Sequence, residues 1–261
     1  MDQSICFVFS QGYPPAVDPR EFAIQYEIEE THWWFKARRR LVRRFAEEQR
    51  ARLGRPLRIL DVACATAMSF RFLGDLGTIR GLDISKETIH FAKQRGIDRI
   101  VRGDAQKMPF RDEAFDLVLA LDAFEHFPDD VASMKEVSRV LDRGGALVCT
   151  VPAYMALWSP HDDAFHHLRR YTRGELTSKL KTNLAIERCS YYSFFLAPPL
   201  YVFRKLRALL GKGEAPRSDF TVPIPAVVEW GLATLMRIES WLLRFVSLPF
   251  GASLICVSRR R

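Results

Sequence analysis

Several features common in other protein classes are missing from this chain of 261 residues. Its five cysteines form no CxxC pair and no zinc-ligand spacing, and their odd number favours reduced thiols and a cytoplasmic protein. No uncharged apolar run reaches the roughly 20 residues that a membrane-spanning helix needs. The N-terminus has no basic region ahead of a long apolar core, so we expect no signal peptide.

Acidic residues are too few to balance the basic ones, and the formal net charge is +8. The basic excess gathers in clusters at 38–44, 169–170, 204–217 and 259–261. A solvated surface explains them most simply, and attraction to phosphate, on lipid headgroups or on a substrate, is the alternative. The chain has no recognition helix and no RNA-binding motif, so we expect no nucleic acid partner.

The middle of the chain alternates short apolar runs with helical patterns. These patterns predict strands at 57–63, 78–83, 98–102, 115–121 and 145–151, and helices at 67–75, 86–95, 130–141 and 173–181. Such alternation is typical of an α/β fold with a Rossmann-like, doubly wound, mostly parallel sheet. Two further strands, at 184–193 and Ala252–Arg259, bring the expected sheet to seven strands.

Four segments are expected along the chain. Residues 1–56 form an irregular lead-in and a helical lid, in which 21–50 is a single helix. The α/β core follows over 57–193. An apolar insertion over 194–247, with helices at about 194–210 and 225–246, separates that core from its final strand in 248–261.

Three acidic residues follow apolar runs at nearly equal intervals. Asp61, Asp83 and Asp104 lie 22 and 21 residues apart, about the length of one strand–helix–strand unit. Such spacing places carboxylates at the carboxyl ends of successive parallel strands, where open α/β sheets bind ligands. This is the layout of a nucleoside-binding crevice. A dinucleotide-binding domain would have GxGxxG after the first strand, and this chain has no glycine there.

The order of these motifs resembles that of the class I S-adenosylmethionine (SAM) dependent methyltransferases. The resemblance implies SAM as cofactor, bound by residues at four strand ends: Asp61, Ala63, Ala65, Asp83, Ile84, Asp104, Ala105 and Leu121. It implies that Asp83 accepts hydrogen bonds from the ribose and that Asp104 and Ala105 contact the adenine. The family has glycines where this chain has Ala63, Ala65 and Ala67. Where the backbone must be left-handed, alanine costs about 1–2 kcal/mol.

Further segments are similar to a bacterial subgroup within the small-molecule and lipid branch of that family. They are Glu29–Arg38 (Glu-x-x-His-Trp-Trp-Phe-x-x-Arg), Ser159–Tyr171 (Ser-x-His-Asp, then His-x-Arg-Arg-Tyr) and Leu248–Leu254. The fourth strand ends in Leu-Asp-Ala-Phe at 121–124, whereas enzymes that methylate bases or glutamine have Asn/Asp-Pro-Pro-Tyr/Phe there. The resemblance therefore implies methyl transfer to an oxygen or carbon of a small-molecule or lipid-like acceptor.

Histidines and acids are dense after the fifth strand, and the catalytic candidates lie there: His161, Asp162, His167 and Tyr171. An imidazole with a pKa near 6.5 accepts a hydroxyl proton at neutral pH, and the neighbouring Asp162 would orient His161 as a general base. His161, Asp162 and His167 also match metal-ligand types, but their spacing is not diagnostic and we expect no metal.

Structural explanations of the same segments stay open. Arg169 and Arg170 either bind an acidic acceptor or pair with Glu29 and Glu30 in a clasp to the N-terminal helix. At the exit of the fourth strand, the Glu-His pair at 125–126 either faces the active site or begins a polar helix.

The insertion is rich in aromatic residues with Arg and Lys interspersed. Basic amphipathic helices of this kind are typical of membrane interfaces, which predicts peripheral contact with the inner face of the membrane. A helical cap over the active site and a homodimer surface are the alternatives. Two other functions also stay open: a SAM-fold protein that does not methylate (a cyclase, eliminase or scaffold), and a membrane-surface interaction module.

Overall fold

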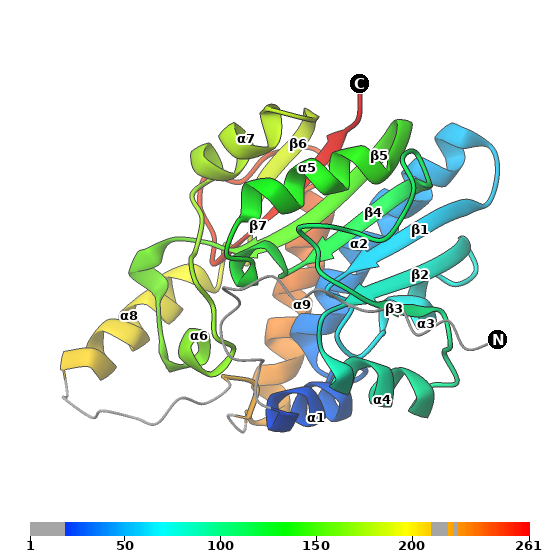
Figure 1. Cartoon of the computed structure of the whole chain (residues 1–261). Coiled ribbons are helices and arrows are strands. Elements are labelled where there is room, and N and C mark those ends of the chain that lie inside the picture. Colours follow the sequence, from blue (N-terminus) through cyan, green and yellow to red (C-terminus); the bar gives the residue numbers. More distant parts are fainter. Residues whose placement is uncertain (1–18, 210–218, 222–223) are drawn as a thin grey trace.

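Residues 19–209, 219–221 and 224–261 are described by the computed structural model. Most of the expected lead-in, Cys6, and most of the loop between the two inserted helices lie outside the described residues. Figure 1 shows one central sheet with helices on both faces.

The sheet confirms the predicted α/β, mostly parallel architecture. Its strands are β1 (Leu57–Val62), β2 (Gly77–Asp83), β3 (Ile100–Arg102), β4 (Phe115–Leu121), β5 (Leu141–Pro152), β6 (Ala185–Tyr192) and β7 (Ser253–Arg259). They lie in the order β3-β2-β1-β4-β5-β7-β6, and β7 is antiparallel to both of its neighbours. The strand order reverses between β1 and β4, which is where a ligand crevice forms in open α/β sheets.

Helices α5 and α7 cover one face of the sheet, whereas α2 lies over the other face with α9 beside it (Figure 1). The helices are α1 (Pro19–Ile28), α2 (Trp33–Leu53), α3 (Ser69–Leu73), α4 (Lys86–Gln94), α5 (Asp130–Val140), α6 (Pro160–Ala164), α7 (Arg173–Lys181), α8 (Ala197–Leu209) and α9 (Ala226–Leu242). Three short 3-10 helices are η1 (Phe124–His126), η2 (Met155–Leu157) and η3 (Asp219–Thr221).

The prediction of one helix over 21–50 is wrong, because the chain breaks between α1 and α2. His32 has an extended backbone, and its Nδ1 accepts a hydrogen bond from the Trp34 N–H at 3.3 Å. This side chain therefore caps a new helix, a role that Ser, Thr, Asn and Asp usually fill and that hydrophobic periodicity does not reveal.

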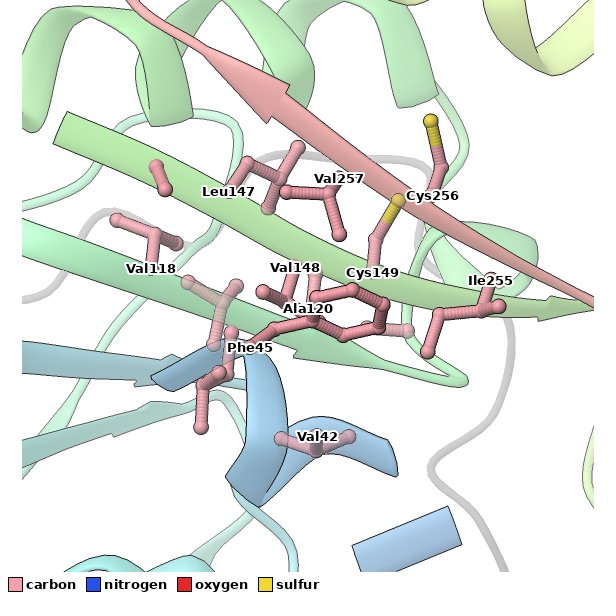
Figure 2. Close-up of a cluster of buried hydrophobic side chains, with 14 of the residues drawn as sticks. Val42, Phe45, Val118, Ala120, Leu147, Val148, Cys149, Ile255, Cys256 and Val257 are labelled. Carbon is pink, nitrogen blue, oxygen red and sulfur yellow. The ribbon is translucent and has the colours of Figure 1, made fainter. Parts of the chain in front are cut away.

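One part of the hydrophobic core lies between α2 and the central strands. Figure 2 shows Val42 and Phe45 of α2 among side chains of β4, β5 and β7. The labelled strand residues are Val118, Ala120, Leu147, Val148, Cys149, Ile255, Cys256 and Val257. Burying a side chain such as Phe45 contributes about 1.5–3 kcal/mol to the free energy of unfolding. This packing stabilises the strands whose ends form the site.

The turn after β1 is left-handed at all three alanines that stand where the resembling family has glycine. Ala63, Ala65 and Ala67 have φ of 55°, 45° and 58°. This turn passes so close to β2 that a Cβ at Gly81 would lie 2.6 Å from Sγ of Cys64. The turn therefore keeps the conformation that favours glycine and carries the cost of alanine in that region.

We expect Ala65→Gly to raise the free energy of unfolding by about 1 kcal/mol, since the gain from a relaxed left-handed residue exceeds glycine's entropic cost. Urea denaturation measures the change. The control is Ala51→Gly on the exposed face of α2, which is expected to lower stability by about 1 kcal/mol. A loss of stability in both variants would contradict this account of the turn.

Candidate functional site

A cavity of about 1100 Å³ opens at the carboxyl ends of the parallel strands. Six of the eight residues predicted to bind the cofactor line it: Ala63, Ala65, Asp83, Ile84, Ala105 and Leu121. They come from the ends of β1, β2 and β4 and from the loop after β3. The sequence thus predicted which strand ends share one wall of this cavity, because parallel strands end at the same edge.

Asp83 is the carboxylate that reaches this wall. Its side chain is buried, and its two oxygens accept hydrogen bonds from the N–H groups of Ala65 and Ser85, each at 2.9 Å. Burial raises the pKa of Asp83, and the hydrogen bonds from Ser85 and Ala65 oppose that rise. Each carboxylate oxygen has a second lone pair, so Asp83 can also accept hydrogen bonds from a ligand at the cavity wall.

Two of the three carboxylates expected to grip the ligand, Asp61 and Asp104, lie apart from this wall, and their contact with a ligand stays a prediction. Both lie outside the set of residues that line the cavity. Asp61 is buried beneath the turn, and burial raises its pKa to about 7. Asp104 Oδ1 accepts a hydrogen bond from the Gln106 N–H at 2.7 Å, so it shapes the loop that presents Ala105. Equal spacing along the chain fixed the strand ends but not the direction of each side chain.

Helix α1 is tied to the turn after β1 by a buried acid. Glu29 accepts a hydrogen bond from the hydroxyl of Thr66 and pairs with Arg95 at 2.5 Å. Arg95 also donates to the Thr66 carbonyl at 2.9 Å. The structure therefore does contain a clasp to the N-terminal segment, but its cation is Arg95 and not the predicted Arg169 or Arg170.

The opposite half of the cavity is aromatic and rich in histidine. Phe220 of η3 lies at its centre, with ring centroids 4.8 Å from Phe35 and 5.4 Å from Trp34 of α2. The same ring lies 5.2 Å from His161 of α6 and 5.5 Å from His32. The insertion, the N-terminal helices and the segment after β5 thus meet around Phe220, a residue that the sequence analysis did not single out.

The predicted pairing of His161 with Asp162 is wrong. Asp162 instead accepts a hydrogen bond from Nδ1 of His167 at 2.9 Å and from Arg170 at 2.7 Å. Nδ1 of His161 accepts from the Asp219 N–H at 3.2 Å, and burial lowers the pKa of His161 to about 4. His161 and His167 both line the cavity, whereas Asp162 is fully buried behind them.

Tyr171 lies outside the set of residues that line the cavity, and its catalytic role stays a prediction. It is buried, and its hydroxyl donates to Asp130 Oδ2 at 2.7 Å. Arg169 pairs with the same aspartate at 3.2 Å. This group joins the segment after β5 to α5 and supports the fold. Glu125 and His126 lie in the short helix η1 and also line the cavity, so both descriptions left open at the exit of β4 apply to them.

The part of the chain that carries the strand ends matches a known family. Residues 60–149 match the family described as "Methyltransferase domain". Demethylmenaquinone methyltransferase of Staphylococcus aureus is 30% identical over 118 residues, which cover 40% of this chain and 48% of that protein. The Staphylococcus saprophyticus protein of the same name is 36% identical over 98 residues, or 34% of this chain and 42% of that protein. The chain therefore spans about half the length of the curated relatives it matches.

Solved structures share the fold over most of the chain. The cyclase SpnF has a TM-score of 0.55 at 22% identity, covering 97% of this chain and 88% of that one. A chain of the structure described as "Complex between the Haloferax volcanii Trm112 methyltransferase activator and the putative methyltransferase" has a TM-score of 0.57 at 19% identity, covering 92% of this chain and 94% of that one. The cofactor implied by the family is SAM, and a buried carboxylate beside a turn of small residues suits a ribose at the cavity wall.

We expect Asp83→Ala to weaken SAM binding by on the order of 100-fold, because two charge-assisted hydrogen bonds to the ribose are lost. Calorimetry measures the affinity. The control is Asp98→Asn on the exposed loop before β3, which also removes one negative charge. Because Asp83 also holds the turn, Asp83→Asn is measured alongside. Affinity like that of the wild type in both Asp83 variants would remove this residue from the cofactor site.

Proposed function

We propose that this chain, a class I SAM-dependent methyltransferase by family, transfers the SAM methyl group to an oxygen or carbon of a small, lipid-like acceptor. The observation that carries the proposal is a single cavity with two unlike halves. One half is the wall of small residues around Asp83, and the other is the chamber around Phe220. A donor in the first half and an acceptor in the second would share one enclosed space.

For this reaction the protein mainly has to align the methyl donor with the acceptor. SAM supplies an activated sulfonium methyl group, so no residue has to form a covalent intermediate. The wall at Asp83 and Ala65 would fix the donor, and the aromatic chamber would hold the acceptor and exclude water. The exit of β4 has Leu121 and Asp122, without the Pro-Pro motif of amide methylases, which favours oxygen or carbon as the methylated atom.

The shape of the chamber favours an apolar acceptor. Its walls include Phe35, Phe220, Leu200, Phe203 and Leu232, from both the N-terminal segment and the insertion. Curated relatives are named for methylation of demethylmenaquinone, a ring with an apolar tail. We therefore propose a prenylated aromatic alcohol as the acceptor class. The N-terminal helices and the insertion together act as its lid, with Phe220 as the point where they meet.

The acceptor assay measures S-adenosylhomocysteine release with a prenylated demethylnaphthoquinol and with the same ring without its prenyl tail. We expect methylated product and a KM at least about tenfold lower for the prenylated compound, because five more carbons are buried. His161→Ala is expected to lower turnover with SAM affinity unchanged, since this residue lines the acceptor half. Equal KM values would contradict an apolar acceptor, and conversion without S-adenosylhomocysteine release would favour a non-methylating activity.

The outer faces of α8 and α9 expose unusually large apolar side chains. Trp230 is 68% exposed and Phe245, which follows α9, is 70% exposed. Tyr201, Val202, Leu206, Val227, Ile238 and Trp241 are also exposed. Exposed Lys205, Arg237 and Arg244 lie among them. None of the described helices is long and apolar enough to cross a bilayer. We propose that this surface rests on anionic lipid, which would deliver a lipid-like acceptor to the cavity.

Vesicle flotation tests this contact. We expect the full chain to float with vesicles containing phosphatidylglycerol and to bind less as salt is raised. Trp230→Ser and Trp241→Ser are each expected to lower partitioning on the order of tenfold, from the lost burial of an aromatic ring. The control is Val131→Ser, an exposed apolar residue on α5, which should not change binding. Equal binding by all variants would contradict the assignment of this surface.

A further inference from the structure

Two histidines and a glutamate converge on one point of the cavity wall. Glu125 and His126 belong to η1 at the exit of β4, and His167 belongs to the loop after α6. One potential ligand atom from each of the three lies within 4.8 Å of the others. All three residues line the cavity in its histidine-rich half. Residues more than 40 positions apart in the chain thus present a nitrogen, nitrogen, oxygen donor set to the same space.

The Glu125 carboxyl group has no hydrogen-bond partner within the part of the chain that the structure describes, and burial raises its pKa. Its side chain is fully buried, and neither carboxylate oxygen has a hydrogen-bond partner there. Burying such a group without a partner is costly, and folded proteins rarely leave one unsatisfied. Because Glu125 also lines the cavity, the missing partner is expected to come from a bound ligand.

One of the two histidines, His167, is held in place by a buried carboxylate on the side away from the cavity. Nδ1 of His167 donates to Asp162 at 2.9 Å, and Asp162 is fixed in turn by Arg170 at 2.7 Å. In the neutral ring this arrangement leaves Nε2 of His167 as the atom that can bind a ligand. The ring of His126 lies edge-on to that of His167, with centroids 4.8 Å apart. A carboxylate or a backbone group behind a histidine is the usual outer shell of a metal ligand, because it fixes the tautomer and the ring direction.

We propose that Glu125, His126 and His167 bind a divalent transition metal such as Zn²⁺. Imidazole and carboxylate suit zinc and its neighbours, whereas Mg²⁺ and Ca²⁺ prefer sites made of oxygen alone. Three protein ligands leave at least one position open toward the cavity, as in catalytic rather than structural zinc sites. The sequence analysis expected no metal and grouped His161 and Asp162 with His167, whereas the structure groups His167 with Glu125 and His126.

The proposal that a metal binds is argued from this geometry alone. A role of that metal in catalysis rests on the proposed methyl transfer. An acceptor hydroxyl on the open position would lose its proton to solvent more easily, because a bound cation lowers its pKa. The acceptor oxygen would then form a bond to the methyl carbon as the bond from that carbon to sulfur breaks. S-adenosylhomocysteine and one proton would be released. This role favours an oxygen as the methylated atom.

The test titrates chelator-treated full-length protein with Zn²⁺ by calorimetry and with Co²⁺ by visible absorption, before any SAM or acceptor is added. We expect one equivalent of each, with a Co²⁺ spectrum of low coordination number, and no competition from millimolar Mg²⁺. Glu125→Gln and His167→Ala are expected to lose more affinity than the roughly 10- to 100-fold that loss of an outer-shell partner costs. The control is His90→Ala on the exposed face of α4, which should bind like the wild type.

SAM affinity is measured on every variant by calorimetry, which shows that each is folded. Weak or non-stoichiometric binding by the wild type would overturn the metal site, and so would unchanged metal affinity in both ligand variants. Metal binding with no methylation of any acceptor would leave the site in place and count against the proposed function. Methylation that is unaffected by chelation would instead leave the function in place and remove the metal from it.

Discussion

One contact sets the geometry on which the site depends: the N–H of Ala65 donates to the carboxylate of Asp83 at 2.9 Å. To make it, the turn after β1 folds back toward the end of β2 in a left-handed conformation at three alanines. Gly81 leaves room for Cys64 beneath this turn. The parallel pairing of β1 with β2 then holds both partners of the contact at one edge of the sheet.

The rest of the cavity is built by segments that do not belong to the matched domain. Helices α1 and α2 precede residues 60–149, and α6, η3 and α9 follow them. Glu29 ties the first of these segments to the turn at Thr66, and Phe220 joins it to the insertion. The domain thus supplies the strand ends, and the additions enclose a space for a second molecule. The family match at residues 60–149 therefore covers the strand ends but not the segments that enclose the other half of the cavity.

Much of this architecture could be predicted from the residues. Apolar runs ending in small and acidic residues located the strand ends, and the sheet required those ends to share one edge. The direction in which each side chain points was harder to predict from the sequence. His161 and Asp162 are neighbours in sequence, but adjacent residues on a helix point apart, and Asp162 is the third residue of α6. The side chain of Asp162 instead contacts His167, which lies in the loop after α6. The break at His32 escaped prediction for a similar reason, since a histidine cap has no hydrophobic signature.

The central claim is that a nucleoside lies across the strand ends against Asp83 and the left-handed turn. A crystal structure with S-adenosylhomocysteine tests it most directly. The account predicts ribose hydroxyls within hydrogen-bonding distance of the Asp83 carboxylate, with Ala63 and Ala65 beside the ligand and the Ala65 N–H still bonded to Asp83. A ligand bound elsewhere, or a turn that must abandon this hydrogen bond to admit it, would contradict the account.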